Sequence, residues 1–195
     1  MCDADNVAAM AKVQPDLMGF IFHEASLRFC AQMPEVNLPS GIIRVGVFVN
    51  SSLNYILEKK QEFGLNLAQL HGQESPDFCR EVSRYLPVMK AFNVHEDFDF
   101  LKVKAYEEIC DYFLFDASGL RAGGNGIQFN WDLLQKFQGK TPFFLSGGIR
   151  PDSVMAIREF NHPSLAGIDI NSGFEIRPGL KDIEKIKQFK YELSS

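Results

Sequence analysis

Two short glycine-containing segments are the clearest candidates for binding chemistry. Residues 146–148 (SGG) and 171–173 (NSG) each follow an apolar run near the carboxyl end of the chain. Small residues let backbone N–H groups approach an anion closely, and the start of a following helix adds a positive dipole. Tight turns also use glycine, but two such segments in succession favour a phosphate site formed by Gly147, Gly148, Ser172 and Gly173. The phosphate-binding patterns GxxxxGK[ST] and strand-following GxGxxG are absent from the sequence, so nucleotide binding is not supported.

Two aspartates occupy apolar surroundings. Asp116 ends the apolar run 112–116, and burial there favours the protonated carboxyl group that a general acid needs. An aspartate at such a position also caps helices or turns. Asp169 lies inside the apolar run 165–170, so its carboxylate must be paired, either with the structure or with a substrate hydroxyl.

Three further positions carry groups that could bind or react. Arg28 could clamp a carboxylate with its bidentate guanidinium, although a lone loop arginine is more often solvated. Gln69 and His71 are two positions apart at a strand end and can face the same side, although a core or turn histidine is more common. Lys90, in another apolar run, would form a Schiff base if desolvated, but a buried ion pair is the more frequent outcome.

The composition bounds the class of protein. The 195 residues are 46% hydrophobic and 23% charged, with a net charge of −5, so neither a disordered chain nor a nucleic-acid partner is expected. Apolar runs stay below the roughly 18 residues of a membrane span, and the first residues do not resemble a signal peptide. The four cysteines and four histidines are dispersed, which predicts reduced thiols, no metal site and a cytoplasmic location.

Strand and helix patterns alternate along the chain. Strands are expected at 17–22, 44–50, 67–72, 87–92, 112–116, 142–148 and 165–170. Helices are expected at 4–13, 52–63, 75–86, 97–109, 129–137, 152–160 and 182–195. This alternation predicts a parallel sheet covered by helices, either an open doubly wound sheet or a (β/α)₈ TIM barrel. In both, the candidate residues gather at the carboxyl ends of the strands.

The chain resembles one enzyme family over nearly its whole length. The runs that carry the resemblance are, in order, GFIF, SLR, RVGVFVN, AQLHGQES, PVMKAF, LFD with GGNGIQFNW, FFLSGGI and GIDINSGFEIRPGLKD. They follow the pattern of the phosphoribosylanthranilate isomerases of tryptophan biosynthesis. The resemblance implies a (β/α)₈ barrel, with residues 1–195 as one domain, that acts on a small molecule without a cofactor. The implied reaction is the Amadori rearrangement of N-(5-phosphoribosyl)anthranilate to 1-(2-carboxyphenylamino)-1-deoxyribulose 5-phosphate, an aldose-to-ketose isomerisation.

The resemblance also implies roles for the candidate residues. Asp116 would be the general acid that protonates the ribose ring oxygen. Arg28 would hold the anthranilate carboxylate, and Asp169 would contact the ribose hydroxyls. Gln69 and His71 would line the substrate site. The phosphate would bind Gly147, Gly148, Ser172 and Gly173.

The start of the chain departs from the family pattern. The family opens with a strand ending in Cys-Gly-Met, and its cysteine is the general base that removes the C2′ proton. Alignment of Asn6 and the following helix places Met1 on that methionine, so the base cysteine is expected two positions before Met1, and Cys2 is not its equivalent. The sequence therefore predicts a barrel that lacks its first strand and has little activity unless that strand is restored. A smaller departure is Leu27, where the family has proline.

Two other functions remain open on the sequence. One is a different phosphate-binding barrel lyase that uses Lys90 as a Schiff base. The other is a non-catalytic remnant that binds a phosphorylated ligand without turnover.

Overall fold

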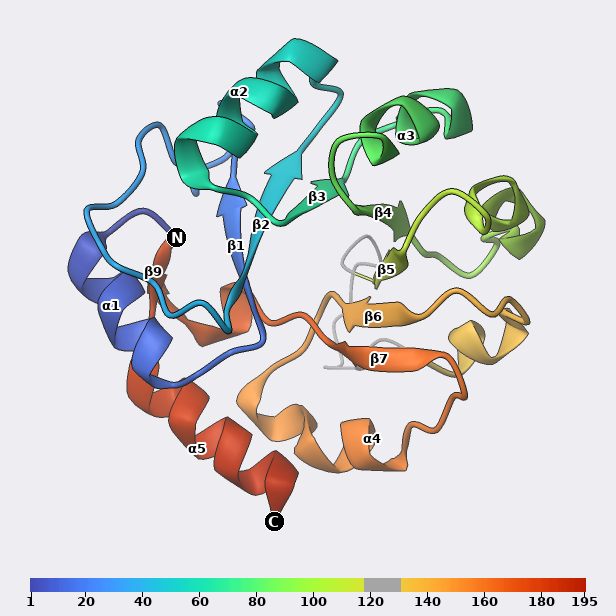
Figure 1. Ribbon diagram of the computed structural model, residues 1–195. Helices are drawn as coiled ribbons and strands as arrows, with labels where there is room; N and C mark the ends of the chain where they lie inside the picture. Colours follow the sequence, from blue (N-terminus) through green and yellow to red (C-terminus); the bar gives the residue numbers. More distant parts are fainter. Residues whose placement is uncertain (118–130) are drawn as a thin grey trace.

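Seven parallel strands form one sheet in which each strand pairs with the next along the chain. The computed structural model describes residues 1–117 and 131–195. The strands are β1 (Leu17–Ile21), β2 (Ile43–Phe48), β3 (Leu67–Leu70), β4 (Val88–Asn93), β5 (Tyr112–Asp116), β6 (Phe143–Ser146) and β7 (Leu165–Ile168). Figure 1 shows the sheet curling around a central space. A doubly wound sheet reverses its strand order at a switch point, so the sequential order confirms the (β/α)₈ type of fold.

Helices cover the outside of the curled sheet (Figure 1). They are α1 (Ala4–Lys12), α2 (Leu53–Phe63), α3 (Pro76–Ser83), α4 (Val154–Glu159) and α5 (Ile183–Ser194). The side chains of Asp3, Ser52, Ser75 and Asp182 accept hydrogen bonds from backbone N–H groups in the first turns, which explains where four of these helices begin. In the described part of the chain, none of the helices has the length and apolar character needed to cross a membrane.

Two expected helices are 3₁₀-helices in the structure and are shorter than predicted. The first, η1 (Phe100–Tyr106), lies within the expected 97–109, and η2 (Trp131–Lys136) lies within the expected 129–137, whose first two residues are outside the described residues. Apolar residues recur every third position in both: Phe100, Val103 and Tyr106, then Trp131, Leu134 and Phe137. Three residues per turn is the 3₁₀ repeat, so this spacing places each set on one inward face.

The hairpin and the 3₁₀ turn that follow β7 were not predicted. An antiparallel hairpin, β8 (Glu175–Arg177) with β9 (Leu180–Lys181), follows the 3₁₀ turn η4 (Ser172–Phe174). Its connection includes Gly179, whose φ of 83° suits glycine. A further turn, η3 (Pro151–Ser153), leads directly into α4.

The side chains of the sheet alternate between its inner and outer faces. On the inner face an apolar layer is formed by Val45, Leu67, Met89, Ala91 and Leu114. On the outer face, residues such as Phe48, Leu70 and Phe113 join the large core beneath the helices. Because successive side chains of a strand point to opposite faces, residues two positions beyond the apolar layer also point inward, at the carboxyl ends of the strands.

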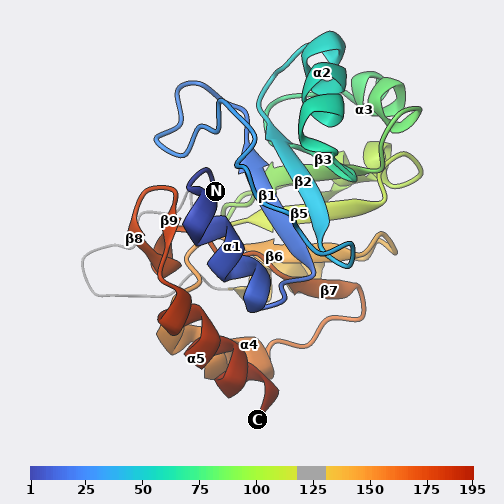
Figure 2. The ribbon, with the colours of Figure 1, turned by 60° about the vertical axis from the view of Figure 1, so that its left-hand side comes forward.

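The side of the molecule between β1 and β7 is covered by α1, the β8–β9 hairpin and α5 (Figures 1 and 2). Among the described residues, β1 and β7 are the two edges of the sheet. The Asn6 side chain donates to the Lys181 carbonyl and accepts from the Lys181 N–H, each at 2.8 Å, which ties α1 to β9. The Met1 ammonium group donates to the Gly19 carbonyl on β1 at 3.2 Å.

Candidate active site

A histidine and an aspartate meet at the carboxyl ends of the strands. His71 follows β3 and Asp116 ends β5, and the distance from His71 Nε2 to Asp116 Oδ2 is 3.3 Å. Both side chains are partly exposed, at 25% and 14%. The pair is therefore accessible to solvent and lies next to the apolar inner layer. This arrangement is suited to proton transfer.

Gln69, on β3, lies two positions before His71 and faces the same side of the sheet. The distance from its Oε1 to His71 Nδ1 is 2.8 Å, and its Nε2 donates to Met89 Sδ at 3.5 Å. Gln69 and Met89 are register partners on β3 and β4. Gln69 is buried, so it contacts His71 from inside the barrel.

Asp169 occupies the same level two strands away from Asp116. The Ser146 hydroxyl, at the end of β6, donates to Asp169 Oδ2 at 2.8 Å. Burial raises the pKa of Asp169, and the bond from Ser146 and the positive charge of Lys181 offset that rise only in part. Ser146 is also the register partner of Asp116. The structure thus brings both candidate aspartates to the mouth of the barrel, where the carboxyl ends of the strands lie, as the sequence predicts.

Arg28 is already held by a carboxylate. Its Nε and Nη2 donate to Glu175, with Nη2 2.6 Å from Oε2, and Lys181 Nζ lies 3.2 Å from the other oxygen of Glu175. Burial alone raises the pKa of Glu175, but the bonds from Arg28 and Lys181 outweigh it and leave that pKa lowered. Burial also lowers the pKa of Lys181, against the attraction of Glu175. The guanidinium of Arg28 is therefore fixed at the mouth.

The two glycine-containing segments are in contact. Gly147 and Gly148 have φ values of 84° and 69°, and a Cβ on Gly173 would lie 2.5 Å from the Ile149 carbonyl oxygen. Ser172 precedes Gly173 in η4. The predicted phosphate residues of β6 and β7 are thus brought together, and larger side chains would be strained or excluded at these glycines.

Lys90 points to the outer face of the sheet, whereas the candidate site residues lie on its inner face. Its side chain is 3% exposed, and its Nζ donates to Glu74 at 3.1 Å and to three backbone carbonyls. Glu74 in turn accepts from the N–H groups of Asn50 and Gly72. Lys90 therefore forms a buried ion pair, which is a more frequent outcome for such a lysine than a Schiff base. Its amine does not face the candidate site.

Cys2 lies beside the loop that carries Arg28. In its protonated form its Sγ donates to the Phe29 carbonyl oxygen, 3.3 Å away. A hydrogen bond with Cys30 lowers the pKa of the Cys2 thiol to about 6, against the effect of burial and with help from the nearby Met1 ammonium group. All four cysteines are free thiols, among them Cys30, Cys79 and Cys110, which the sequence predicts to be reduced.

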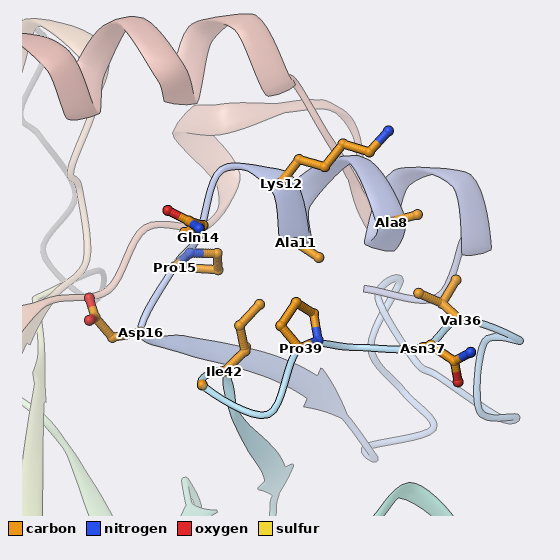
Figure 3. Close-up of a pocket in the computed structure, with 11 residues that line it drawn as sticks. Ala8, Ala11, Lys12, Gln14, Pro15, Asp16, Val36, Asn37, Pro39 and Ile42 are labelled. Atoms are coloured by element: carbon orange, nitrogen blue, oxygen red, sulfur yellow. The ribbon is translucent and has the colours of Figure 1, made fainter.

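A separate cavity lies at the other end of the strands. It is a solvent-open pocket of about 600 Å³ between α1 and the segment 36–42, with Pro15, Pro39 and Ile42 on its wall (Figure 3). Lys12 and Asp16 are its charged lining residues. It contains none of the candidate residues. The amino-terminal face of such folds usually serves stability rather than chemistry.

Glu175 and Lys181 are site residues that the sequence analysis missed. Both lie in the GFEIRPGLKD run, but Glu175 gains its role from a contact with Arg28, 147 positions away, and Lys181 gains its role from its ion pair with Glu175. Most of the GGNGIQFNW run that contributes to the family resemblance lies within residues 118–130, outside the described residues. Among residues 1–117 and 131–195, no cluster of three or more His, Cys, Asp or Glu side chains is arranged to hold a metal ion.

Comparison of sequences places the chain among known relatives. A family model described as N-(5'phosphoribosyl)anthranilate (PRA) isomerase matches residues 1–191. The N-(5'-phosphoribosyl)anthranilate isomerase of Phocaeicola vulgatus is 46% identical over 194 residues, which cover 99% of this chain and 94% of that protein. The protein of the same name from Parabacteroides distasonis is 44% identical over 195 residues, covering 97% of this chain and 88% of that protein.

Solved structures of phosphoribosyl anthranilate isomerases also superpose on this chain. A phosphoribosyl anthranilate isomerase from Thermotoga maritima superposes with a TM-score of 0.84 at 31% identity, covering 100% of this chain and 95% of that one. A second such isomerase, in complex with reduced 1-(o-carboxyphenylamino)-1-deoxyribulose 5-phosphate, gives a TM-score of 0.80 at 30% identity, covering 98% and 93%.

Proposed function

Because this chain belongs to the N-(5'-phosphoribosyl)anthranilate isomerase family, we propose that it acts on N-(5-phosphoribosyl)anthranilate in tryptophan biosynthesis. The reaction is the Amadori rearrangement to 1-(2-carboxyphenylamino)-1-deoxyribulose 5-phosphate. The observation that carries the proposal is the 46% identity to a relative of that name over nearly the whole chain. The related isomerase in complex with the reduced carboxyphenylamino-deoxyribulose phosphate supports the same small-molecule substrate.

Asp116 is the proposed general acid. It protonates the ribose ring oxygen, the C1′–O bond breaks, and the nitrogen lone pair of the anthranilate forms a Schiff base with C1′. Loss of the C2′ proton then gives an enolamine, which becomes the ketone. The contact of Asp116 with His71 supports this role, because it provides a partner with which the carboxyl group can share a proton.

The other roles follow the chemistry of the substrate. Arg28 binds the anthranilate carboxylate with the N–H groups that Glu175 leaves free. Asp169 accepts a hydrogen bond from a ribose hydroxyl while Ser146 holds its other side. His71 lines the substrate site, with Gln69 behind it. The phosphate binds the backbone of the loops that carry Gly147, Gly148, Ser172 and Gly173.

The C2′ proton requires a base, which we assign to the cysteine that the family pattern has before the position of Met1. We also propose that residues 1–195 form one domain, since a single continuous sheet runs through the chain. A cytoplasmic location is consistent with four free thiols.

The proposal is tested by following the fluorescence decay of N-(5-phosphoribosyl)anthranilate. The expected result is isomerase turnover that depends on Asp116. Trapping of the protein by borohydride in the presence of substrate would instead favour the lyase, and the four hydrogen bonds of the buried Lys90 amine oppose that outcome. Substrate binding without turnover, even after a strand that ends in Cys-Gly is added before Met1, would favour the non-catalytic remnant.

A further inference from the structure

The contacts of Gln69 decide which nitrogen of His71 carries a proton. The Gln69 Oε1 atom is only an acceptor, so His71 Nδ1, 2.8 Å away, must be the donor. The orientation of the amide is fixed from the other side, because its Nε2 lies 3.5 Å from Met89 Sδ, and a thioether sulfur accepts but does not donate. Reversing the amide would place its Oε1 against Met89 Sδ, which sets two acceptors against each other.

The remaining nitrogen of His71 faces Asp116. With Nδ1 protonated, the neutral imidazole presents the Nε2 lone pair to Asp116 Oδ2 at 3.3 Å. An ionised carboxylate at that position would place two acceptors against each other. The contact is favourable only when one proton lies between Nε2 and Oδ2, either on the carboxyl group or on the imidazole.

We propose that Gln69 is a positioning residue that fixes the His71 tautomer, so that His71 and Asp116 together hold the one proton that is delivered to the substrate. This inference rests on the proposed role of Asp116 as general acid. It assigns to Gln69, expected from the sequence to line the substrate site, a function exerted through His71. Met89 contributes by holding the amide in the productive orientation.

Other charged groups surround this pair. From β7, Asp169 faces both Asp116 and His71, and from β9, Lys181 faces Asp169. Ser146 on β6 is uncharged and binds Asp169. The Lys90–Glu74 ion pair lies on the outer face of β4 and its neighbours, and it holds the backbone on both sides of His71 through the carbonyls of Leu70 and Gly72.

The test is ¹⁵N NMR of histidine-labelled full-length chain, which reports the protonation of each ring nitrogen without any need for turnover. We expect the neutral imidazole of His71 to carry its proton on Nδ1, so that Nε2 alone exchanges a proton with Asp116. His162 is an internal control with the opposite tautomer, because its Nδ1 accepts from the Ser164 N–H at 3.1 Å while its Nε2 faces the Phe137 carbonyl oxygen at 2.9 Å. A neutral His71 with its proton on Nε2 would overturn the proposal.

Two variants separate positioning from packing. Gln69→Leu removes the acceptor and keeps an apolar contact with Met89, so the Nδ1-protonated form of His71 should be lost while the signals of His162 stay unchanged. Gln69→Glu keeps an acceptor for Nδ1 and should preserve that tautomer. An unchanged His71 spectrum in Gln69→Leu would contradict the proposal.

The same variants have a kinetic consequence. In a form of the protein with isomerase activity, Gln69→Leu should lower kcat about tenfold or more with KM changed less than about threefold, since general-acid transfer contributes at least about a hundredfold. Gln69→Glu should recover most of kcat. Loss of substrate turnover in every form, with the NMR result as expected, would refute the proposed function and leave the tautomer assignment standing. Normal kcat in Gln69→Leu would refute the positioning role.

Discussion

Arg28 and Glu175 lie 147 positions apart in the sequence, and their side chains form a bidentate ion pair across the mouth of the barrel. Arg28 comes from the loop after β1, and Glu175 begins β8 after the loop of β7. The ion pair therefore connects the two edge strands of the sheet at their carboxyl ends. It fixes the guanidinium that we assign to the substrate carboxylate, so its loss should affect both stability and binding.

Glu175→Gln should lower the free energy of unfolding by about 1–3 kcal/mol at pH 7, since it removes the carboxylate that forms ion pairs with both Arg28 and Lys181. The pKa of Glu175 is lowered in the folded protein, so its contribution is present above about pH 4.3 and is lost as the pH falls. Thermal melts should therefore show a difference from the parent chain at pH 7 that shrinks below about pH 4. Glu184→Gln, which removes an exposed pair with Lys187, should cost less than about 0.5 kcal/mol. Equal effects of both changes would contradict this prediction.

Asp116→Asn should lower kcat by about a hundredfold or more, because an amide cannot protonate the ring oxygen. Binding of the substrate should change little, so KM should stay within about threefold of the parent value. The measurement is steady-state fluorescence decay of the substrate with an active form of the protein. Asp77→Asn, at a 91% exposed side chain on α3, is the matched control and should leave kcat unchanged. An unaltered kcat in Asp116→Asn would remove this residue from its role.

A chain extended before Met1 by a β-strand ending in Cys-Gly should have much higher isomerase activity than the 195-residue chain. The Met1 ammonium group bonds to the Gly19 carbonyl, so an extension would leave Met1 along the open edge of β1. The comparison is made by fluorescence decay at equal protein concentration. A matched extension ending in Ser-Gly should fold equally well, as judged by its melting temperature, but should lack the added activity. Full activity of the Ser-Gly form would contradict the assignment of a cysteine base.

Cys2 should be the most reactive thiol of the protein at neutral pH. Its pKa of about 6 makes it largely thiolate at pH 7, whereas an ordinary thiol has a pKa near 8.5. Alkylation by iodoacetamide, followed by peptide mapping, should modify Cys2 first, at a rate that stops rising above about pH 7. Cys79 and Cys110 are buried and serve as internal controls. Cys30→Ala should raise the pKa of Cys2, and an unchanged rate profile in that variant would contradict the assigned cause.

Lys90→Met should destabilise the fold by about 3–5 kcal/mol, because it leaves the buried carboxylate of Glu74 without its partner. Combining it with Glu74→Gln should recover part of this loss, since the uncompensated charge is then removed. Chemical denaturation of the two single variants and the double variant measures the coupling. Strictly additive losses would show that Lys90 and Glu74 do not act as a pair.

Local sequence patterns were sufficient to predict the seven strands of the parallel sheet, but not the β8–β9 hairpin, and they were less reliable for the helices. Val45, Leu67 and Leu114 fall in short apolar runs, so each strand could be found without knowledge of its neighbours. The residues Phe100, Val103 and Tyr106 fit a three-residue repeat, but an interrupted helical pattern did not distinguish that repeat from an α-helix. In the structure all three side chains pack against the outer core, and a 3₁₀-helix places residues at this spacing on one face.

The position of a candidate site residue was predicted where it follows from the local pattern of strands and helices, and a contact was missed where it depends on a distant partner. Gly147 and Asp116 stand at the ends of recognisable strands, so their place at the mouth follows from the alternation of elements. The contact between Glu175 and Arg28 depends on how the last loop folds back towards the first, which local sequence patterns do not report. The orientation of Gln69 towards His71 rather than towards a ligand likewise depends on Met89, on the neighbouring strand.

The apolar inner layer, formed by Val45, Leu67, Met89, Ala91 and Leu114, has a consequence for evolution. The residues that we propose to bind the substrate or react with it lie on the carboxyl-end side of this layer, whereas the burial of apolar side chains in the layer and in the outer core stabilises the fold. A substitution at Asp169 or His71 alters chemistry at little cost to the layer beneath. New substrate preferences can therefore arise by substitutions at the carboxyl ends of the strands. The apolar layer keeps the barrel folded, so substitutions within it are tolerated far less.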